Sequence, residues 1–330
     1  MDKAVMVTGG NGFLGSYVCC QLAERGYQVV SYDIAPPRPA NQFIQAPSRD
    51  SIRYYNGQVT DLSRILGVCQ AAKVSAIVHT AAVLGHVGAV EQPYATYQVN
   101  TLGPLMVFEA ARLFNLDRVV FISSNAVYQK KQYEPMDELH PIFSPSSGNL
   151  ATHYGASKAA AEVIGLTYFT FNAVDLIILR MASVYGFGTQ NPMYIKPMVE
   201  NSVLGLPTSF PTGAEMVRDY TYVKDSASAV LKALEADGAA LSQRVFNTSA
   251  GKLYSAGEVA RIVKEIVPDA QIEIGPGLTD LERSDIQARG ALDCRKAKEE
   301  MGYLPVHDLR RGIQDYVATV RSYLESGGCL

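Results

Sequence analysis

Short apolar segments alternate with amphipathic segments through the first half of this 330-residue chain. Strands are expected at residues 5–7, 28–33, 52–55, 76–79, 118–122 and 175–180, and helices at residues 13–25, 62–72, 94–114 and 156–171. Apolar strands separated by helices are typical of a parallel sheet that is covered on both faces. The pattern therefore predicts an α/β fold with a Rossmann-type, doubly wound parallel sheet.

The alternation weakens after about residue 185, where Gly, Pro and Met become more frequent. Shorter strands are expected at residues 217–222, 244–247 and 271–274, and helices at residues 225–235, 256–266 and 312–324. We expect residues 1–185 to form the main domain. Residues 186–330 are expected to form mainly a smaller C-terminal α/β substrate lobe, with some chain returning to the main domain.

A glycine-rich turn follows the first expected strand. Gly9, Gly12 and Gly15 recur at every third position, and Phe13 and Leu14 lie at the start of the next helix. Residues without a Cβ allow backbone N–H groups to approach a pyrophosphate at the helix N-terminus. The turn therefore predicts a dinucleotide site formed by these five residues.

Asp33 ends the second expected strand. A carboxylate at this position accepts hydrogen bonds from the adenosine ribose hydroxyls and repels a 2′-phosphate. We therefore expect NAD rather than NADP as the cofactor. Arg38, in an expected proline-rich loop over residues 36–47, is the one feature that would suit a 2′-phosphate.

Two further motifs carry proton chemistry. Tyr154 and Lys158 are four residues apart, so they share one face of an expected helix. An ammonium beside a phenol lowers the phenol pKa from about 10 toward neutrality. Ser123 and Ser124 end another expected strand, at the sheet edge where α/β folds bind ligands. Each motif alone is common in helices and turns, but together they predict proton exchange with an alcohol or carbonyl.

In combination, these motifs resemble the extended short-chain dehydrogenase/reductase family. The resemblance is greatest to its NAD-dependent epimerase/dehydratase branch, which includes nucleotide-sugar 4-epimerases. It covers essentially the whole chain and rests on Thr8-Gly9-x-x-Gly12-x-x-Gly15, Asp33, Asp61-Leu62, His79-Thr80-Ala81-Ala82, Asn100, Ser123-Ser124-x-x-Val127-Tyr128 and Tyr154-x-x-x-Lys158.

The resemblance implies a role for each matching residue. Asp61 and Leu62 would hold the adenine end of NAD, and Ala81 and Ala82 would lie along the cofactor, as would Ser123. Asn100 would brace the active-site helix. Ser124 would bind the reacting oxygen, Tyr154 would be the acid/base, and Lys158 would bind the nicotinamide ribose and lower the tyrosine pKa.

The resemblance also suggests substrate contacts in the second lobe. Arg218 lies in the segment Val217–Asp225, which matches a family motif whose arginine contacts a substrate phosphate, and Arg283 aligns roughly with a second such arginine. The alternative for Arg218 is a local ion pair with an acid such as Asp225. His86, Ser183 and Tyr194 are further candidates for the substrate pocket.

Several residues around the expected substrate depart from the nucleotide-sugar members of the family. Ser183 stands near a usual Asn, Phe187 replaces the proline of Tyr-Gly-Pro, and His153 precedes Tyr154. Three hypotheses therefore stay open. The chain is an NAD-dependent 4-epimerase of a nucleotide sugar, a dehydrogenase or reductase of another hydroxyl compound that releases NADH, or a noncatalytic NAD-sensing protein. Dehydration is disfavoured, because Asn125 and Ala126 stand where 4,6-dehydratases carry Asp and Glu.

Composition restricts the partners. A net charge of -3 argues against binding to nucleic acid. No apolar run approaches the ~20 residues of a membrane span, and no signal peptide is apparent. The 5 cysteines form no C-x-x-C pair, and no zinc site is expected. We expect free thiols in a reducing cytoplasm instead. The apolar residues of the helices at 94–114 and 156–171 suggest a homodimer.

Overall fold

The computed structural model describes residues 4–84, 92–128, 130–142 and 152–330. Seven parallel strands form one sheet in the order β10-β6-β5-β4-β1-β2-β3. They are β1 (Ala4–Thr8), β2 (Gln28–Asp33), β3 (Ile52–Asn56), β4 (Val74–His79), β5 (Arg118–Ser124), β6 (Leu176–Met181) and β10 (Val245–Thr248). The strand order reverses between β1 and β4, and open α/β sheets bind ligands beside such a reversal, at the carboxyl ends of the strands. The predicted Rossmann-type sheet is confirmed.

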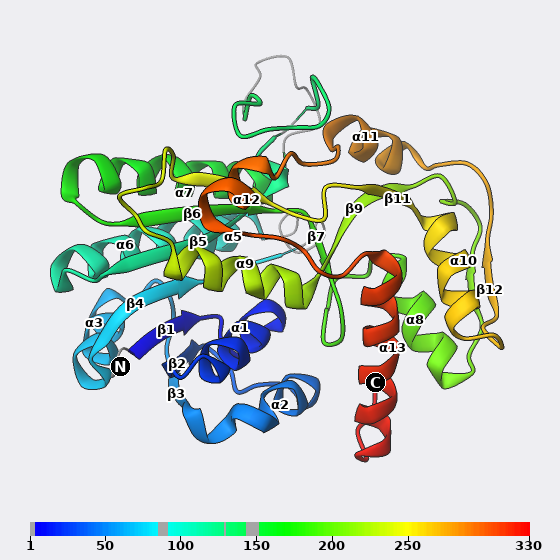
Figure 1. Cartoon of the computed structure of the whole chain (residues 1–330), viewed down its shortest axis with the longest axis horizontal. Coiled ribbons are helices and arrows are strands. Elements are labelled where there is room, and N and C mark those ends of the chain that lie inside the picture. Colours follow the sequence, from blue (N-terminus) through cyan, green and yellow to red (C-terminus); the bar gives the residue numbers. More distant parts are fainter. Residues whose placement is uncertain (1–3, 85–91, 129, 143–151) are drawn as a thin grey trace.

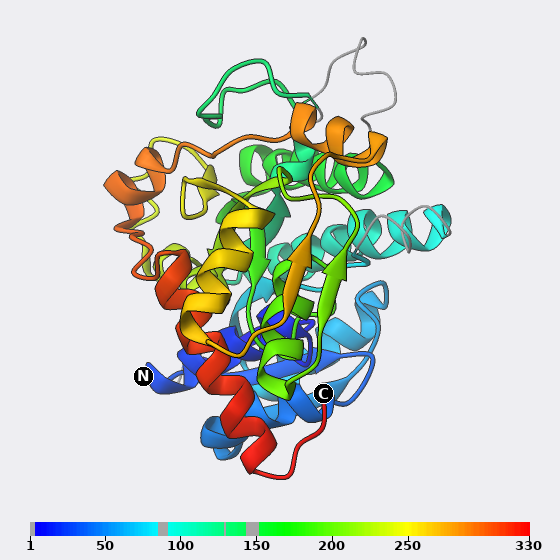
Figure 2. The ribbon, with the colours of Figure 1, turned by 90° about the vertical axis from the view of Figure 1, so that its right-hand side faces the viewer.

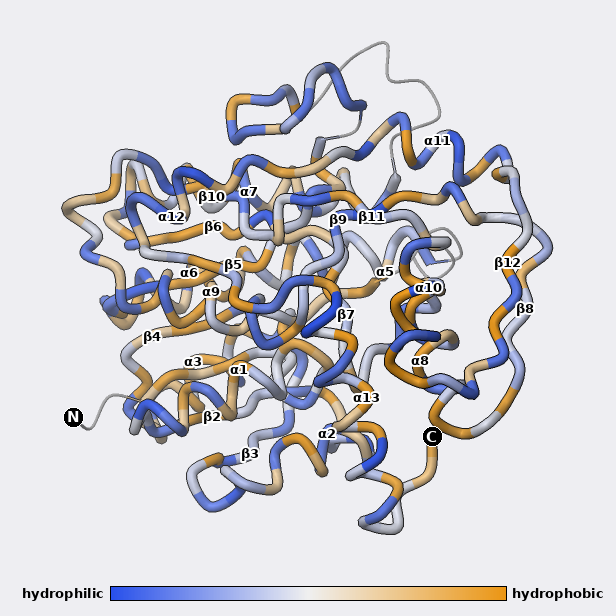
Figure 3. The backbone as a smooth tube through the Cα atoms, turned by 45° about the vertical axis from the view of Figure 1, so that its right-hand side comes forward, coloured by the Kyte–Doolittle hydropathy of each residue, from blue (hydrophilic) through white to orange (hydrophobic). Residues whose placement is uncertain are grey.

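Helices cover both faces of this sheet (Figure 1). One face carries α1 (Phe13–Glu24) and α9 (Val223–Glu235), and the other carries α3 (Leu62–Ala72), α6 (Gly103–Phe114) and α7 (His153–Asn172). Successive strand residues point to opposite faces, so Val5 and Val7 join one core and Met6 joins the other. Figure 3 shows β5 and β6 in apolar colours along most of their length, as expected for strands buried on both faces.

Two expected elements differ in detail. The proline-rich segment is largely helical, with α2 (Pro39–Gln45) followed by a short 3-10 helix, η1 (Ala46–Ser51). Pro39 occupies the first turn of α2, where its missing N–H costs no hydrogen bond. The expected helix over residues 94–114 is interrupted: α5 (Pro93–Tyr97) leads into a π-helical turn, η2 (Gln98–Leu102), and then into α6.

The second half of the chain forms a smaller lobe beside the sheet (Figure 2). Its strands are β7 (Ser183–Tyr185), β9 (Val217–Tyr222) and β11 (Leu253–Ser255) in one sheet, and β8 (Thr208–Phe210) and β12 (Ile272–Ile274) in another. Its helices are α8 (Ile195–Leu204), α10 (Ala256–Ile266), α11 (Asp280–Ala288), α12 (Arg295–Met301) and α13 (Leu309–Glu325). Both α9 and β10 return to the large sheet, so one hydrophobic core runs through both halves. Among the described residues, no helix is long and apolar enough to cross a membrane.

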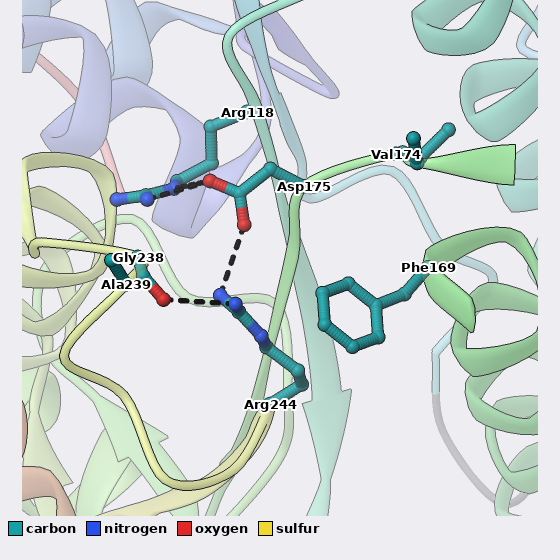
Figure 4. Close-up of a pocket in the computed structure, with 8 residues that line it drawn as sticks. Arg118, Phe169, Val174, Asp175, Gly238, Ala239 and Arg244 are labelled. Atoms are coloured by element: carbon teal, nitrogen blue, oxygen red, sulfur yellow. Dashed lines mark hydrogen bonds and ion pairs between the residues drawn. The ribbon is translucent and has the colours of Figure 1, made fainter.

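The amino ends of β5, β6 and β10 are held together by charged side chains, which we call the amino-edge cluster: Arg118, Asp175 and Arg244 (Figure 4). Arg118 Nη2 lies 2.6 Å from Asp175, and Arg244 Nη1 lies 3.0 Å from the same carboxylate. Arg118 Nη1 also donates to the carbonyl oxygens of residues 233, 234 and 236 at the end of α9. A cavity of about 420 Å³ beside the cluster is lined by Phe169 and these side chains. The cluster lies at the opposite end of the strands from the predicted site, and its donors are taken up by the protein itself.

Candidate active site

The glycine turn lies between β1 and α1 with the geometry that its sequence predicts. Gly9 adopts a φ of 69°, a left-handed conformation that favours glycine, and a Cβ there would lie 2.8 Å from the backbone of Ala81. A Cβ on Gly15 would collide with the carbonyl of Gly9. The turn therefore requires glycine at positions 9 and 15, because it packs closely against the start of α1 and the segment after β4.

The N-terminus of α1 suits an anion. Its N-cap, Gly12, offers no side-chain hydrogen bond, and no acid stands in the first turn, where Phe13 and Leu14 lie. Backbone N–H groups and the positive end of the helix dipole are thus available to a phosphate. Asp33 ends β2 beside the turn, where its carboxylate accepts from Asn11 N at 3.0 Å and Ala35 N at 3.3 Å. These residues fit a dinucleotide.

The other expected cofactor residues lie on the same carboxyl edge of the sheet. Asp61 caps the N-terminus of α3, which Leu62 begins, and accepts from the backbone N–H of Arg64 at 3.0 Å. Ala81 and Ala82 follow β4 directly. The glycine turn lies directly against the segment after β4, because a Cβ on Gly9 would be only 2.8 Å from the backbone of Ala81.

Asn100 occupies the π-helical turn and is fully buried. Its side chain accepts from Val83 N at 2.8 Å and donates to Val83 O at 3.0 Å. It also donates to Ser157 Oγ at 3.2 Å, and Ser157 lies on α7 between Tyr154 and Lys158. The π-helical turn therefore points an amide into α7, which agrees with the expected bracing role.

Ser124 and Tyr154 meet at the carboxyl end of β5. Ser124 is the last residue of β5, and its hydroxyl lies close enough to the Tyr154 phenol, at the start of α7, to act on the pKa of that phenol. Thr152 caps α7 by accepting from Gly155 N at 3.0 Å. Burial raises the pKa of the Tyr154 phenol, while the Ser124 hydroxyl and the charge of Arg289 oppose that rise.

Lys158 lies one turn further along α7 and is 1% exposed. Its Nζ donates to the carbonyl of Ile122 at 2.8 Å and lies 6.0 Å from the centroid of the Tyr154 ring. Burial lowers the pKa of the Lys158 ammonium to about 7, and the charge of Glu162 opposes this effect. Arg289 is the cation whose charge acts on the Tyr154 phenol in this structure, and the effect expected of Lys158 on the tyrosine pKa stays a prediction.

Ser123 points away from Ser124, as adjacent residues of a strand must. Its hydroxyl donates to Glu162, which also pairs with Arg180 of β6 at 2.7 Å. The side chains of Glu162 and Arg180 are only 1% and 6% exposed. The side chain of Ser123 thus belongs to a buried network that fastens α7 to β5 and β6, and the expected contact of Ser123 with the cofactor stays a prediction. The sequence analysis missed this ion pair, although Arg180 stands in an otherwise apolar strand and requires a partner.

The two arginines expected to bind the substrate differ in their surroundings. Arg218 of β9 pairs with Asp285 of α11, not with Asp225, and Asp285 also binds Arg289 Nε at 3.0 Å. We call Arg218, Asp285 and Arg289 the carboxyl-edge cluster. Arg283, in contrast, has a 59% exposed side chain that lies 3.6 Å from Asp280. Arg289, which was not predicted, is the arginine whose charge acts on Tyr154.

Of the three remaining candidates for the substrate pocket, two lie among the described residues. Tyr194 donates its hydroxyl hydrogen to Glu282 of α11 and packs edge-on against Phe210. Ser183 begins β7 and pairs in register with Tyr220. His86 lies outside the described residues.

Comparisons with known proteins agree with this geometry. The sequence model of the NAD dependent epimerase/dehydratase family matches residues 5–249. A putative UDP-glucose 4-epimerase of Methanocaldococcus jannaschii is 31% identical over 95% of this chain and 97% of its own length. The UDP-glucose 4-epimerase of Bacillus subtilis is 26% identical over 96% of this chain and 95% of its own.

Solved structures show the same fold. A Thermus thermophilus UDP-glucose 4-epimerase in complex with NAD superimposes with a TM-score of 0.80 at 26% identity, over 96% of this chain and 99% of that one. The cofactor is therefore NAD, which the glycine turn and Asp33 fit. This chain belongs to the NAD-dependent epimerase/dehydratase family and is an enzyme of the short-chain dehydrogenase/reductase type.

Proposed function

We propose that this enzyme is a 4-epimerase of a UDP-sugar. The observation that carries the proposal is the proximity of Ser124 and Tyr154 at the carboxyl edge of the sheet. The glycine turn expected to bind NAD follows β1, which lies two strands away from β5 on the same edge. Relatives named as UDP-glucose 4-epimerases match nearly the whole chain. Their similarity supports the same reaction class.

The cofactor would be held by the residues predicted for it. Gly9, Gly12, Phe13, Leu14 and Gly15 would face the pyrophosphate, Asp33 the adenosine ribose and Asp61 and Leu62 the adenine. Ala81, Ala82 and Asn100 would border the cofactor, and Lys158 would bind the nicotinamide ribose. When bound, NAD supplies the hydride acceptor and donor.

Tyr154 would take the proton of the sugar hydroxyl at its phenolic oxygen and return it later. Ser124 would donate a hydrogen bond to the same substrate oxygen and hold it beside the phenol. Lys158 would stabilise the deprotonated phenol once its ammonium is hydrated or bound to the ribose. Arg218 would bind the substrate diphosphate, since a planar guanidinium suits phosphate oxygens.

One assay separates this reaction from a net dehydrogenase. Purified enzyme would be incubated with UDP-glucose, UDP-galactose and the corresponding UDP-uronates. The product is separated by chromatography while absorbance at about 340 nm follows NADH. We expect an epimer to accumulate without net NADH. Stoichiometric NADH with no epimer would instead support a dehydrogenase of a hydroxyl compound.

A homodimer and a cytoplasmic location stay predictions of this proposal. Large apolar side chains are exposed on the helices expected to pair, including Leu113 of α6, 46% exposed, and Val163 and Phe171 of α7, 57% and 78% exposed. Light scattering should give about twice the 35.8 kDa mass of one chain. All 5 cysteines are free thiols, as a reducing compartment allows.

A further inference from the structure

The short helix α2 lies beside α1 and turns two amide side chains toward the glycine turn (Figure 1). Asn41 and Gln45 are four residues apart, so they share one face of α2. They are the buried residues of this helix, with exposed fractions of 0% and 1%. Amide side chains are mostly found at the surface, and a buried one requires hydrogen-bond partners. For these two amides, the partners include backbone carbonyls of the glycine turn.

Gln45 holds one end of the peptide group between Gly10 and Asn11. Its Nε2 donates to Gly10 O at 2.9 Å, and Asn11 N, at the other end of the peptide, donates to Asp33 Oδ2 at 3.0 Å. The C=O and N–H of a trans peptide lie in one plane and point in opposite directions, so a rotation of this plane would move both contacts. The other side-chain donor recorded for Gly10 O is the weak Cys19 thiol at 3.8 Å. Gln45 therefore helps to fix the Asp33 carboxylate, which is proposed to face the adenosine ribose.

Asn41 holds the next peptide but one, between Gly12 and Phe13. Its Nδ2 donates to Gly12 O at 2.9 Å and to Ser16 Oγ at 3.0 Å, and Ser16 Oγ donates to Gly12 O at 2.7 Å. The N–H at the other end of this peptide belongs to Phe13, the first residue of α1, where a helix provides no acceptor for its own N–H groups. Asn41 thus acts, from behind the turn, on an N–H group that is proposed to face the pyrophosphate.

The amide at position 41 is not the choice that would stabilise the fold most. Asn41 Oδ1 is buried and has no hydrogen-bond donor among the described residues. An unpaired buried acceptor costs free energy, and Gly12 O already accepts from Ser16. A leucine of similar volume would avoid this cost. Orientation of the turn explains the amide better than attachment of α2 does.

We propose that Asn41 and Gln45 are positioning residues for NAD. Both side chains are covered by the protein, so they act through the glycine turn and not by contact with the cofactor. Gln45 sets Asp33 for the adenosine ribose, and Asn41 sets the Phe13 N–H for the pyrophosphate. This inference rests on the cofactor contacts proposed above and not on the reaction catalysed, so its test needs no turnover.

Calorimetry with nucleotide-free enzyme tests the role of Gln45. Q45M removes the amide and nearly keeps the volume. The matched control, Q42M, makes the same change on the exposed side of α2, where Gln42 Nε2 donates to Pro37 O at 2.9 Å. We expect Q45M to raise the Kd for NAD about 10-fold. The preference for NAD over NADP should fall at least about threefold, because a displaced Asp33 repels the 2′-phosphate less. Q42M should change neither quantity by more than about twofold.

ADP and adenosine test the role of Asn41, because only ADP carries the two phosphates. Each would be titrated against bound NADH, with the NADH fluorescence as the readout. We expect N41L to raise the Kd for ADP about 10-fold and the Kd for adenosine less than about twofold. Q45M should instead weaken both by a similar factor, since both contain the ribose. This opposite selectivity is not expected of two variants that only destabilise the fold.

Three results would overturn the proposal. Kd values for NAD within about twofold of wild type in both N41L and Q45M would show that α2 only supports the fold. Equal losses of NAD and NADP in Q45M, or of ADP and adenosine in N41L, would show general damage to the turn. If the wild type binds no NAD, the cofactor contacts and this inference fail together. Loss of turnover alone would concern the proposed epimerase reaction. Each variant is a test of its own, so one that fails to fold leaves the other to decide.

Discussion

Two clusters of the same composition lie at opposite ends of the strands. The amino-edge cluster (Arg118, Asp175 and Arg244) and the carboxyl-edge cluster (Arg218, Asp285 and Arg289) each contain two arginines that share one aspartate. In the amino-edge cluster, backbone carbonyls at the end of α9 and of residue 238 take up further donors. In the carboxyl-edge cluster, no such acceptor is recorded among the described residues. The first cluster thus stabilises the fold through backbone acceptors as well as ion pairs, whereas the second is held, within the described part of the chain, by carboxylates alone.

The difference shows that a charged cluster cannot be interpreted from its residue types alone. What matters is whether the protein itself provides acceptors for the guanidinium donors. A satisfied cluster contributes to the free energy of unfolding, whereas an unsatisfied one lowers it until a ligand binds. Substitutions in the two clusters should therefore affect different measurements.

The largest effect on stability is expected from R118M. The change leaves three carbonyls at the end of α9 without their donor and leaves Asp175 with Arg244 alone. We expect the free energy of unfolding to fall by about 3 kcal/mol, with kcat/KM per folded molecule unchanged. Denaturant titration and steady-state kinetics would measure the two quantities. A loss of activity without a loss of stability would reverse the roles of the two clusters.

A pH series on K158M extends the comparison to a third buried cation at the carboxyl edge. The folded pKa of Lys158 is about 7 and its unfolded value is near 10.4, so the unfolded chain binds the proton more tightly between these values. In the NAD-free protein, this group should therefore make stability rise with pH. From pH 7 to 9, the gain of wild type relative to K158M should be about 2 kcal/mol. The free energy of unfolding would be measured by urea titration at each pH. If it depends on pH in the same way for wild type and K158M, Lys158 does not titrate in this window.

R218M should weaken binding more than folding. Asp285 keeps Arg289 as its partner, so we expect the free energy of unfolding to change by less than about 1 kcal/mol. KM should rise about 10-fold for every UDP-sugar, charged or neutral, because the contact proposed for Arg218 is with the diphosphate. An unchanged KM for all of these substrates would show that Arg218 does not contact the diphosphate.

Within the amino-edge cluster, R244M should have a smaller effect than R118M. Arg118 remains on Asp175, which is 29% exposed, and the main loss is the contact of Arg244 with Gly238 O and with the Phe169 ring, 4.4 Å from the guanidinium carbon. We expect a loss of about 1 kcal/mol in the free energy of unfolding. Thermal or chemical denaturation would detect it. A loss as large as that of R118M would show that the two arginines contribute equally.

Most of the fold could be predicted because its signals are local. The helix α3 was expected at residues 62–72 and forms there, since apolar periodicity and the Asp61 cap define its bounds. The glycine turn could be predicted because left-handed backbone at Gly9 and close approach at Gly15 permit no side chain. Such requirements are set within a few residues of sequence.

The rest of the site depends on contacts between distant segments. Arg289 was missed because α11 was not expected, and whether position 283 or 289 faces Tyr154 depends on how that helix docks onto residues 131–136. The π-helical turn at Asn100 has no sequence signature of its own. The direction of the Ser123 side chain could have been predicted, since strand geometry sends Ser123 and Ser124 to opposite faces.

The central claim is that Tyr154 moves the proton at the carboxyl edge of the NAD-binding sheet. Y154F removes only the phenolic hydroxyl, so the ring and its packing remain. We expect NAD affinity, measured by calorimetry, to stay within about threefold of wild type, and kcat with the best substrate to fall at least about 100-fold. Wild-type turnover in Y154F with NAD binding intact would contradict the account.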